Sequence, residues 1–408
     1  MRIGIVTTWF ERGAAYVSRQ YKELLCRCGH EVFIYARGGE RYAIGDPIWD
    51  RPEVTWGKEP DAIAVNAVNK QDFLNWISDA RLEAVIFNEQ RWLPPVLWAR
   101  EAGCRTIAYV DYYTEETVPL FDVYDGLLCN TKRHYSVFSW HTGCFYLPWG
   151  TDTTLFRPQP GVSPTRRGPV FFHSAGLNPA RKGTDFVIKA FSRLSGESSL
   201  VLHLQEGASF KIPETYSLVE DLAAQGRLQL VVKDVPAPGL YHLGDIYVYP
   251  SHLEGIGLTQ AEALACGLPL IVPDNPPMNE FISPESGIAV PVAKFWSRAD
   301  GYYWPQCQVN LDALVEAMQS FVDDFSSLEE RKQAARAYAE KHLDWFANAS
   351  SLDGWLETLL VKELPEEVRH KICQEEVSSE RIAYRHLRGF PLLWNILLFM
   401  RNWLRRHC

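Results

Sequence analysis

The sequence lacks the features that mark membrane-spanning and nucleic-acid-binding proteins. No apolar run approaches the roughly 20 residues that a membrane-spanning helix needs. Asp and Glu together number 50 against 41 Lys and Arg, for a formal net charge of −9, whereas a nucleic-acid-binding domain normally has a basic excess. The apolar run that starts at Ile3 ends at Val6, so it is too short for a secretory signal peptide. We therefore expect a cytoplasmic protein.

Metal-binding and redox patterns of cysteine are also missing. The nine cysteines include no Cys-x-x-Cys pair and show no ligand spacing with histidine. Several of them lie within apolar runs, as Cys129 and Cys266 do. These features predict reduced cysteines that are buried as small hydrophobic residues. Neither a metal site nor a cofactor is indicated.

The composition itself is that of an ordinary globular protein, with an excess of tryptophan. Hydrophobic residues make up 47% of the chain and charged residues 22%, which is not the composition of a disordered protein. A length of 408 residues suggests two or three domains. The 14 tryptophans either fill the core or stack on sugar rings, and composition alone does not decide between these uses.

The first 150 residues alternate short apolar segments with longer amphipathic ones. This alternation predicts a parallel sheet with helices on both faces, and nearly continuous apolar strands are typical of a sheet that is covered on both sides. The expected strands are 3–7, 31–36, 84–87, 106–110 and 126–129, and the expected helices are 16–27, 71–80 and 96–102.

The alternation begins again after a linker at Thr153–Gly168, which is rich in proline, threonine and glycine. The chain is therefore expected to be an α/β protein with two Rossmann-like, doubly wound domains that face a cleft, where ligands bind at the carboxyl ends of the strands. The expected strands of the second domain are 170–172, 200–204, 228–232, 246–249, 268–272 and 287–290, and its expected helices include 184–194 and 258–265. The expected domains are 1–152 and 153–342, followed by a helix at 343–361 that returns toward the first domain and a C-terminal helical tail at 362–408.

The stretch from Ile246 to Val272 carries the clearest chemical pattern. A strand ends in a Tyr-Pro-Ser turn, Glu254 follows, and a Gly-x-Gly turn leads into a helix that carries Glu262. The backbone N–H groups at the start of this helix would favour a bound diphosphate. These groups belong to Gly257, Leu258 and Thr259. Glu262 lies one helical turn further along, where it would accept hydrogen bonds from ribose hydroxyls, and Glu254 lies nearer the reacting end.

This stretch resembles the E-x7-E signature of the retaining glycosyltransferases of family 4, which have the GT-B fold. Seven residues separate Glu254 from Glu262, and the flanking Tyr-Pro-Ser, Ala-Cys-Gly-Leu-Pro and Asn279-Glu280 also fit. The resemblance implies a nucleotide-sugar donor held mainly on the second domain, an acceptor held mainly on the first, and transfer with retention of anomeric configuration. The alternative is a plain amphipathic helix with solvated carboxylates, because two glutamates at this spacing also arise by chance; the composite of about 35 residues favours the family.

A second match lies at Ser174–Gly183, which resembles the Gly-Arg…Lys-Gly segment whose basic residues hold the donor diphosphate in this family. Lys182 matches the family's lysine, whereas Leu177 stands where many members have arginine, and Arg181 is the candidate to replace it. Such cations would stabilise the negative charge that the leaving diphosphate gains in the transition state. No Asp-x-Asp motif occurs, so the resemblance implies transfer without a metal ion. The alternative is an ordinary charged start of a helix.

A weaker match lies at Gly150–Pro158, which resembles the family's turn between domains and in which Asp152 would fix the turn. The segment Leu343–Leu360 resembles the C-terminal helix that packs back toward the first domain. The resemblance is tight over about 150–290, loose over 1–150 and 310–361, and does not extend to 362–408.

The first half departs from the family pattern at two places near the expected donor. Many members have a Gly-Gly pair in the first loop; only Gly13 is present here, and it either lets the backbone approach the sugar phosphate or is a plain loop glycine. Many members have a histidine after the fourth strand, where this chain has Asp111. We expect Asp111 to meet the sugar or the acceptor as a catalytic residue, with an ordinary strand-end turn as the alternative. His134 and His173 are other candidates, for which structural roles are favoured.

The tail reverses the sign of the charge. Residues 1–152 and 153–361 have net charges of −4 and −8, whereas 362–408 has +3. Within the tail, 381–408 combines six arginines with an apolar segment at 390–400 that is too short to span a bilayer. A basic amphipathic segment with tryptophan suits the membrane interface. We therefore expect peripheral association with the inner face of the cell membrane; docking on the protein or on a second subunit is the alternative.

Together these patterns predict a glycosyltransferase that moves a sugar from a nucleotide-sugar donor to a hydroxyl of a glycan or lipid-linked glycan. One rival is an epimerase or a phosphorylase on the same fold. The other is a non-catalytic scaffold that binds a nucleotide sugar or a partner enzyme. The departures at Leu177 and Asp111 favour the scaffold, whereas the intact pair of glutamates favours the enzyme.

Overall fold

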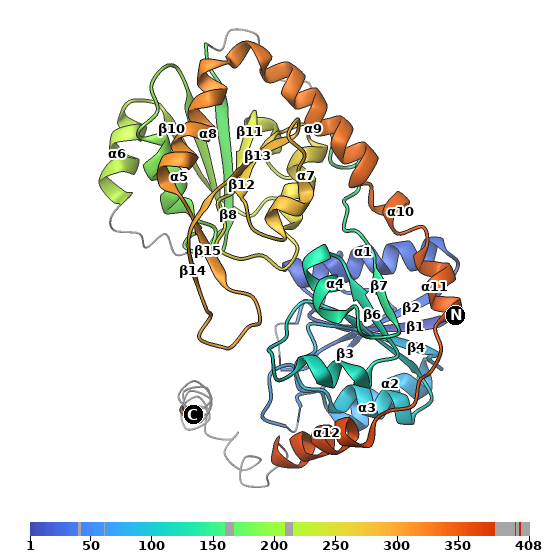
Figure 1. Cartoon of the computed structure of the whole chain (residues 1–408). Coiled ribbons are helices and arrows are strands. Elements are labelled where there is room, and N and C mark those ends of the chain that lie inside the picture. Colours follow the sequence, from blue (N-terminus) through green and yellow to red (C-terminus); the bar gives the residue numbers. More distant parts are fainter. Residues whose placement is uncertain are drawn as a thin grey trace.

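The computed structural model describes residues 1–39, 42–60, 62–159, 167–208 and 215–379, together with Ile396 and Met400. It contains two α/β halves, each built on its own parallel sheet, and Figure 1 shows the second half above the first. Apart from those two positions, the expected amphipathic segment at 381–408 lies outside the described residues. Among the described residues, no helix combines the length and the apolar character needed to cross a bilayer.

The first half contains a seven-stranded sheet with the order β3-β2-β1-β4-β5-β6-β7, in which all neighbours are parallel. The five strands expected from the sequence are confirmed. The two edge strands were missed because each has only three residues, too few for an alternating pattern. The strands are β1 (Arg2–Thr7), β2 (Glu31–Ala36), β3 (Val54–Trp56), β4 (Ala84–Asn88), β5 (Arg105–Tyr109), β6 (Gly126–Cys129) and β7 (Cys144–Tyr146).

Helices cover both faces of this sheet. Short polar side chains begin two of them: Asn69 accepts a hydrogen bond from the backbone N–H of Asp72, and Thr131 accepts one from that of His134, so each satisfies a donor that the first helical turn leaves free. The helices are α1 (Gly13–Arg27), α2 (Lys70–Asp79), α3 (Pro94–Glu101), the 3₁₀ helix η1 (Val118–Val123) and α4 (Lys132–Phe138).

The second half repeats the design with a six-stranded parallel sheet of order β10-β9-β8-β11-β12-β13. All six strands expected there are confirmed. They are β8 (Val170–Gly176), β9 (Ser199–Leu204), β10 (Leu228–Val232), β11 (Ile246–Val248), β12 (Leu270–Pro273) and β13 (Gly287–Val290). The helices are α5 (Thr184–Phe191), α6 (Tyr216–Ala224), α7 (Leu258–Ala265), α8 (Leu311–Asp323) and α9 (Leu328–His342), with the 3₁₀ helices η3 (Tyr241–Leu243), η4 (Met278–Phe281) and η5 (Phe325–Ser327).

An antiparallel hairpin projects from the second half. Its strands are β14 (Val292–Trp296) and β15 (Gln306–Val309), and Figure 1 shows the loop between them reaching down to the first half. We call residues 292–309 the arm. The arm is not predictable from the sequence, because β14 follows β13 after one residue and its exposed residues carry no regular apolar pattern.

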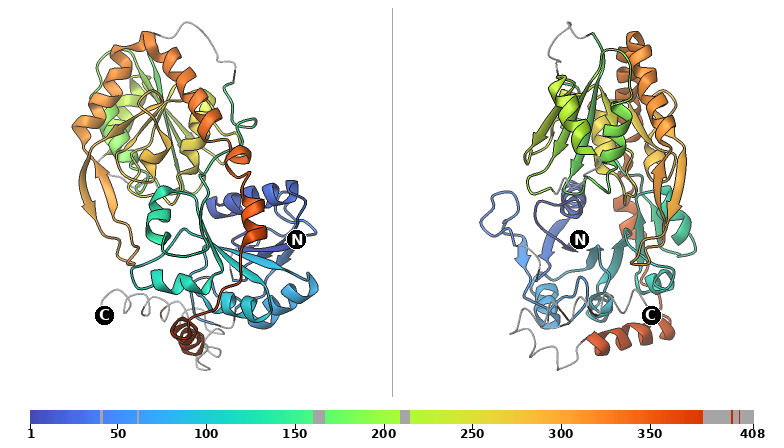
Figure 2. Two further views of the ribbon diagram at one scale, coloured as in Figure 1. Left: turned by 45° about the vertical axis from the view of Figure 1, so that its right-hand side comes forward. Right: turned by 90° about the vertical axis from the view of Figure 1, so that its left-hand side faces the viewer.

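The chain then returns to the first half, as Figure 2 shows. The single helix expected at 343–360 is wrong: two short helices occur instead, α10 (Trp345–Asn348) and α11 (Leu352–Thr358). Between them the Ser350 hydroxyl donates to the carbonyl of Ala347, a bond that competes with continued helix. This segment contacts the first half, where the rings of Trp345 and Tyr21 meet edge to face with centroids 5.1 Å apart.

The last described helix, α12 (Glu366–Ser379), packs against α3 and η1 of the first half. The C-terminal tail at 362–408 is expected to be helical, and its described part does contain this helix. Its side chains Val368 and Ile372 are buried in the core of the first half. This part of the expected tail therefore belongs structurally to the first half.

Most of the tryptophans that the structure describes are buried in the core. The buried tryptophans are Trp9, Trp49, Trp76, Trp92, Trp98, Trp149 and Trp345. The prediction that the cysteines are buried was partly wrong, because Cys26 and Cys28 are exposed. Cys26 lies in the last turn of α1 and Cys28 at its C-cap. The other described cysteines are buried or half-buried.

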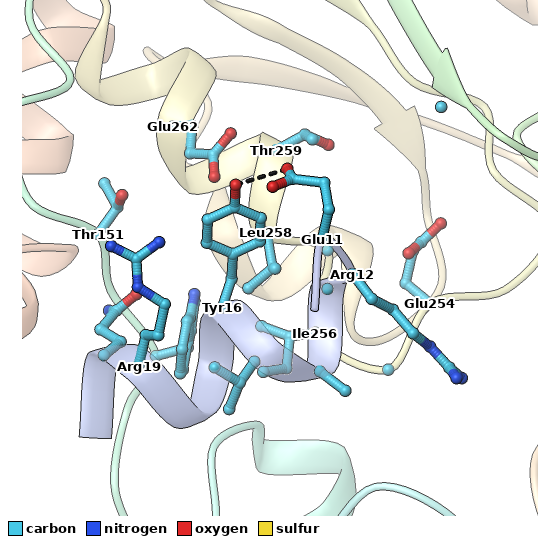
Figure 3. Close-up of a pocket in the computed structure, with 18 of the residues that line it drawn as sticks. Glu11, Arg12, Tyr16, Arg19, Thr151, Glu254, Ile256, Leu258, Thr259 and Glu262 are labelled. Carbon is cyan, nitrogen blue, oxygen red and sulfur yellow. Dashed lines mark hydrogen bonds between the residues drawn. The ribbon is translucent and has the colours of Figure 1, made fainter. Parts of the chain in front are cut away.

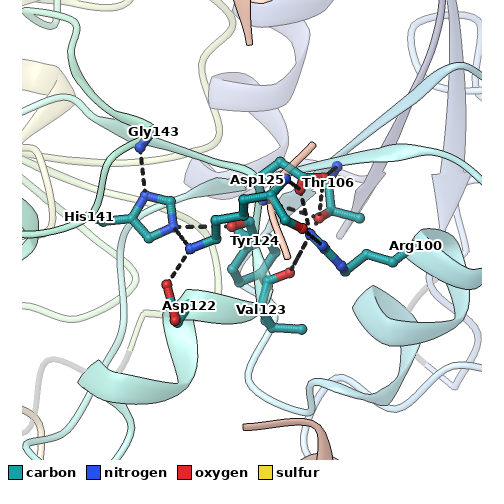
Figure 4. Close-up of polar contacts among 9 residues, drawn as sticks. Arg100, Thr106, Asp122, Val123, Tyr124, Asp125, His141 and Gly143 are labelled. Atoms are coloured by element: carbon teal, nitrogen blue, oxygen red, sulfur yellow. Dashed lines mark hydrogen bonds and ion pairs between the residues drawn. The ribbon is translucent and has the colours of Figure 1, made fainter. Parts of the chain in front are cut away.

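A buried ion pair attaches the segment between α11 and α12 to the first half (Figure 4). The carboxylate of Asp125 is fully buried and pairs with the Arg100 guanidinium. It also accepts hydrogen bonds from the backbone N–H of Thr106 at 2.8 Å and of Lys362 at 3.2 Å. The Lys362 ammonium in turn pairs with Asp122. Asp125 therefore joins the start of β5 to the backbone at Lys362, more than 230 residues later.

Replacing Asp125 with alanine is expected to lower the free energy of unfolding by about 3–5 kcal/mol, because Arg100 would stay largely buried without its carboxylate. Urea-induced unfolding followed by tryptophan fluorescence measures the change. The matched control is Asp79→Ala at the exposed end of α2, for which we expect a change below about 0.5 kcal/mol. A loss below about 1 kcal/mol for Asp125→Ala would contradict this account of the cluster.

Candidate active site in the cleft between the halves

A cleft of about 1630 Å³ separates the carboxyl ends of the two sheets. Residues of both halves line it, including Gly13 and Asp111 from the first and Arg181, Glu254 and Glu262 from the second. A site for one drug-sized ligand typically occupies about 300–1,000 Å³. The cleft is thus large enough for two substrates to lie side by side.

Glu254 lies at the centre of a buried cluster of charges in the loop between β11 and α7. Its side chain is 7% exposed. Oε1 accepts hydrogen bonds from Lys182 Nζ at 2.7 Å, Arg181 Nη1 at 3.2 Å and Ser251 Oγ at 2.5 Å. Burial alone would raise the pKa of Glu254, but the charges of Arg181 and Lys182 outweigh it and lower the pKa to about 2. Glu254 is therefore a carboxylate at neutral pH.

The structure brings together the two cations that the sequence predicted for the diphosphate. Arg181 and Lys182 precede α5, and both reach the loop after β11. The Lys182 ammonium also hydrogen-bonds the hydroxyl of Tyr249. Burial lowers the pKa of Lys182 to about 8, although Glu254 opposes this shift. Two cations thus share one carboxylate, and they line a cleft with room for further anionic oxygens.

The N-terminus of α7 opens into the same end of the cleft. Gly257 begins it with a φ of +88°, a conformation that suits glycine. A Cβ atom at this position would lie 2.2 Å from Nε2 of Gln260, so the Gln260 side chain would have to move to accept it. The first-turn residues Leu258 and Thr259 line the cleft, and the first turn of a helix directs free N–H groups toward a ligand.

Glu262 lies one turn further along α7 and faces the first half, as Figure 3 shows. It is half-buried, and the Tyr241 hydroxyl donates a hydrogen bond to its Oε2. Burial raises the pKa of Glu262. The two glutamates therefore occupy different environments: Glu254 is held by cations, whereas Glu262 contacts a neutral hydroxyl.

The first half contributes the start of α1 to the opposite wall (Figure 3). Gly13 lines the cleft, and a Cβ at this position would come no closer than 3.9 Å to Leu258. The hydroxyl of Tyr16 donates to Glu11 at 2.5 Å, and the Arg19 guanidinium lies beside the Tyr16 ring. Tyr16 and Arg19 could not be predicted as cleft residues, because nothing in the pattern of an amphipathic helix shows which residues face a cleft between domains.

Asp111 lies beside a second acidic residue that the sequence analysis also missed. Asp111 follows β5 and Glu89 follows the neighbouring strand β4, and both line the cleft. Burial, and then the charge of Glu89, raises the pKa of Asp111 to about 7. Glu89 has a φ of +53°, a strained conformation for a residue with a side chain. Its position at the carboxyl end of a parallel strand was the signal that could have revealed it.

Two further residues singled out in the sequence, His173 and Asp152, make hydrogen bonds that stabilise the fold. His173 lies inside the second half, where Nδ1 is 2.7 Å from the carbonyl of Val248 and Nε2 is 2.8 Å from the Thr184 hydroxyl. Asp152 accepts hydrogen bonds from the backbone N–H groups of Thr154 and Leu155, as expected for a residue that fixes a turn. Among the described ranges, no three side chains of His, Cys, Asp or Glu converge in a way that could hold a metal ion.

Residues 160–341 match the model of a protein family described as glycosyl transferases group 1. This region covers most of the second half, from the linker to the end of α9, and it includes both glutamates and both cations of the cleft. The match is therefore to the half that carries all the predicted donor residues except Gly13.

Two curated proteins are similar to parts of the chain. A D-inositol 3-phosphate glycosyltransferase of Thermobispora bispora is 30% identical over 138 residues, which make up 30% of this chain and 32% of that protein. The lipopolysaccharide core biosynthesis mannosyltransferase LpsB of Rhizobium meliloti is 26% identical over 230 residues, 54% of each chain. The matches span about a third and about half of the lengths of these relatives.

Solved structures resemble almost the whole chain. Sucrose-phosphate synthase from Thermosynechococcus elongatus superposes with a TM-score of 0.66 at 16% identity and covers 88% of this chain and 98% of its own. Anabaena HepE in complex with UDP-glucose gives a TM-score of 0.65 at 14% identity, covering 88% of this chain and 99% of its own. These neighbours have the GT-B architecture of two Rossmann-like domains, and this likeness shows that the chain has the same fold.

Proposed function

We propose that this chain is a glycosyltransferase that moves a sugar from a nucleotide-sugar donor to a hydroxyl of its acceptor with retention of anomeric configuration. The observation that carries the proposal is the cluster of Glu254 with Arg181 and Lys182, which lies beside the N-terminus of α7 in the cleft between the halves. The family match over 160–341 supports it, because that region contains the cluster.

The donor occupies the side of the cleft that belongs to the second half. Its diphosphate lies between the two cations and the first turn of α7, where N–H groups and the helix dipole favour negative charge. Its ribose hydroxyls donate to Glu262, whose carboxylate lies one turn further along the helix. The complex of HepE with UDP-glucose supports a nucleotide sugar as the ligand of this fold.

The cations assist the departure of the nucleotide. As the glycosidic bond breaks, negative charge builds up on the diphosphate, and Arg181 and Lys182 stabilise it most in the transition state. Since these two residues and the helix N-terminus supply positive charge, we propose that transfer needs no metal ion. Glu254, which is held ionised, orients the two cations and stabilises the positive charge that develops on the sugar.

The acceptor occupies the side of the cleft that belongs to the first half. Asp111 lies there at the end of β5, and its raised pKa allows it to exchange a proton with a hydroxyl near neutral pH. The name of LpsB, a mannosyltransferase of lipopolysaccharide core biosynthesis, supports a glycan or lipid-linked glycan as the acceptor.

We also propose that the basic segment 381–408 holds the enzyme at the inner face of the cell membrane. Its six arginines and its apolar segment are visible in the sequence. Co-sedimentation of the full chain with anionic vesicles tests this. Binding that is lost when the vesicles contain only neutral lipids supports the proposal, and no binding to anionic vesicles refutes it.

The proposed reaction is tested by incubating the full chain with a panel of UDP-, GDP-, ADP- and dTDP-sugars and measuring release of nucleoside diphosphate. We expect release with one group of donors, accelerated by a glycan acceptor, and NMR of the product should show a retained anomeric configuration. Stabilisation of the protein by a nucleoside diphosphate without release from any sugar would instead identify a non-catalytic scaffold. An epimerised nucleotide sugar would identify an epimerase.

A further inference from the structure

The first half reaches into the second half at the loop that carries Glu254. Arg133, near the start of α4, is 4% exposed. Its Nη2 donates to the backbone carbonyl of Glu254 at 2.6 Å, and its Nη1 donates to that of Pro276 at 2.8 Å. Nη2 also lies 3.4 Å from the hydroxyl of Tyr302 in the arm. One buried guanidinium from the first half thus joins three segments of the second.

The next residue holds the next carbonyl of the same loop. His134 Nε2 lies 3.3 Å from the carbonyl of Gly255, and Nδ1 lies 2.8 Å from the Tyr113 hydroxyl. Burial, and then the charge of Arg133, lowers the pKa of His134 to about 3, so the ring is neutral at pH 7. A carbonyl only accepts, so the ring hydrogen is on Nε2 and Nδ1 accepts from Tyr113.

The arm closes this network from the other side. The indole Nε1 of Trp304 donates to the Tyr113 hydroxyl at 2.6 Å, and the backbone N–H of Tyr303 donates to the Tyr113 carbonyl at 2.9 Å. The rings of Tyr112 and Tyr302 stack with centroids 5.4 Å apart. Hydrogen bonds therefore run in one direction, from the arm through Tyr113 and His134 to the loop of Glu254.

The contacts of Arg133 and His134 are with the backbone of the loop and leave the Glu254 carboxylate to Arg181 and Lys182. Consecutive residues of α4 hold consecutive carbonyls, which fixes the peptide plane between Glu254 and Gly255. A guanidinium has several donors in a rigid fork and can serve acceptors on separate segments, which a lysine ammonium does less well.

We infer that Arg133 is a positioning residue: it sets the geometry of the Glu254 loop from the first half, so that the loop takes its active form only while the two halves are in contact. The inference rests on the proposed function. The donor-binding groups Arg181, Lys182 and Glu262 all belong to the second half, so loss of Arg133 should affect turnover and leave nucleotide affinity nearly unchanged.

The test compares Arg133→Gln and Arg133→Lys with the matched control Lys132→Gln, which removes one charge from the adjacent, exposed side chain. We expect kcat to fall about 100-fold in Arg133→Gln and about tenfold in Arg133→Lys, the size of effect that follows small misplacement of catalytic groups. The dissociation constant of the nucleoside diphosphate should change less than about threefold. The control should match the wild type.

A second readout does not depend on turnover. Hydrogen–deuterium exchange of the peptide spanning 253–258 should be faster in both Arg133 variants than in the wild type and the control. If the wild type transfers no sugar but this exchange difference is present, the proposed function fails and the loop-positioning part of the inference stands. Unchanged kcat together with unchanged exchange in a folded Arg133 variant would overturn the inference, as would nucleotide affinity that falls in step with kcat.

Discussion

Glu254→Gln is expected to lower kcat by about 10²- to 10³-fold, the usual cost of removing a preorganised charged group from an active site. The glutamine keeps the shape of the side chain but cannot balance the charges of Arg181 and Lys182, which lie 3.2 and 2.7 Å from the carboxylate. Steady-state kinetics with the donor found in the nucleotide-sugar screen measures the effect.

The same substitution should lower the dissociation constant of the nucleoside diphosphate. In the ligand-free protein the two cations are engaged by Glu254, so neutralising this residue leaves both free for the diphosphate. Glu330→Gln, at an exposed position on α9 of the same half, is the matched control and should leave both quantities unchanged. A folded Glu254→Gln protein with a kcat within about threefold of the wild type would contradict the assigned role.

Lys182→Gln is expected to raise the dissociation constant of the nucleoside diphosphate by about 10- to 100-fold, because a charge-assisted hydrogen bond contributes about 1.5–3 kcal/mol. The effect on kcat/KM should be larger, since the lysine also stabilises the charge of the leaving group. Calorimetric titration and steady-state kinetics measure the two quantities. Lys341→Gln, exposed at the end of α9, provides a control with the same change of charge.

The pH dependence of binding gives an independent check on Lys182. Its buried ammonium has a pKa of about 8 in the ligand-free protein, and only the protonated form attracts the diphosphate. Affinity in the wild type should therefore fall as the pH rises from 7 to 9, and the Lys182→Gln variant should lose this dependence. Equal affinities in the two proteins at pH 7 would exclude Lys182 from the donor site.

The sequence was sufficient to predict the elements that are determined by interactions between residues close together in the chain. Strands such as β4 and β6 are buried on both faces, so their apolar runs mark them directly. The loop and helix from Glu254 to Glu262 could be predicted because Gly257 suits a left-handed turn and the residues after it have a helical pattern. The family resemblance assigned both Glu254 and Lys182 to the donor, but the ion pair between them was found only in the structure.

Contacts between the two halves could not be predicted in this way. In the sequence, Arg133 is an ordinary basic residue. In the structure, it is buried because α4 packs on the loop of Glu254. The arm gives no clear pattern because its partners lie nearly 200 residues earlier in the chain. Glu89 has a φ of +53° directly after β4, and a single sequence does not record this backbone conformation. Each of these features depends on tertiary structure rather than on local propensity.

The central claim is that a nucleoside diphosphate binds between the Lys182 loop and the N-terminus of α7. Hydrogen–deuterium exchange of the full chain, with and without the nucleoside diphosphate that stabilises it best, tests this most directly. We expect slower exchange in peptides covering 174–184 and 253–262, and unchanged exchange in 216–232 at the far edge of the second sheet. Protection confined to other segments, with both cleft peptides unchanged, would contradict the account.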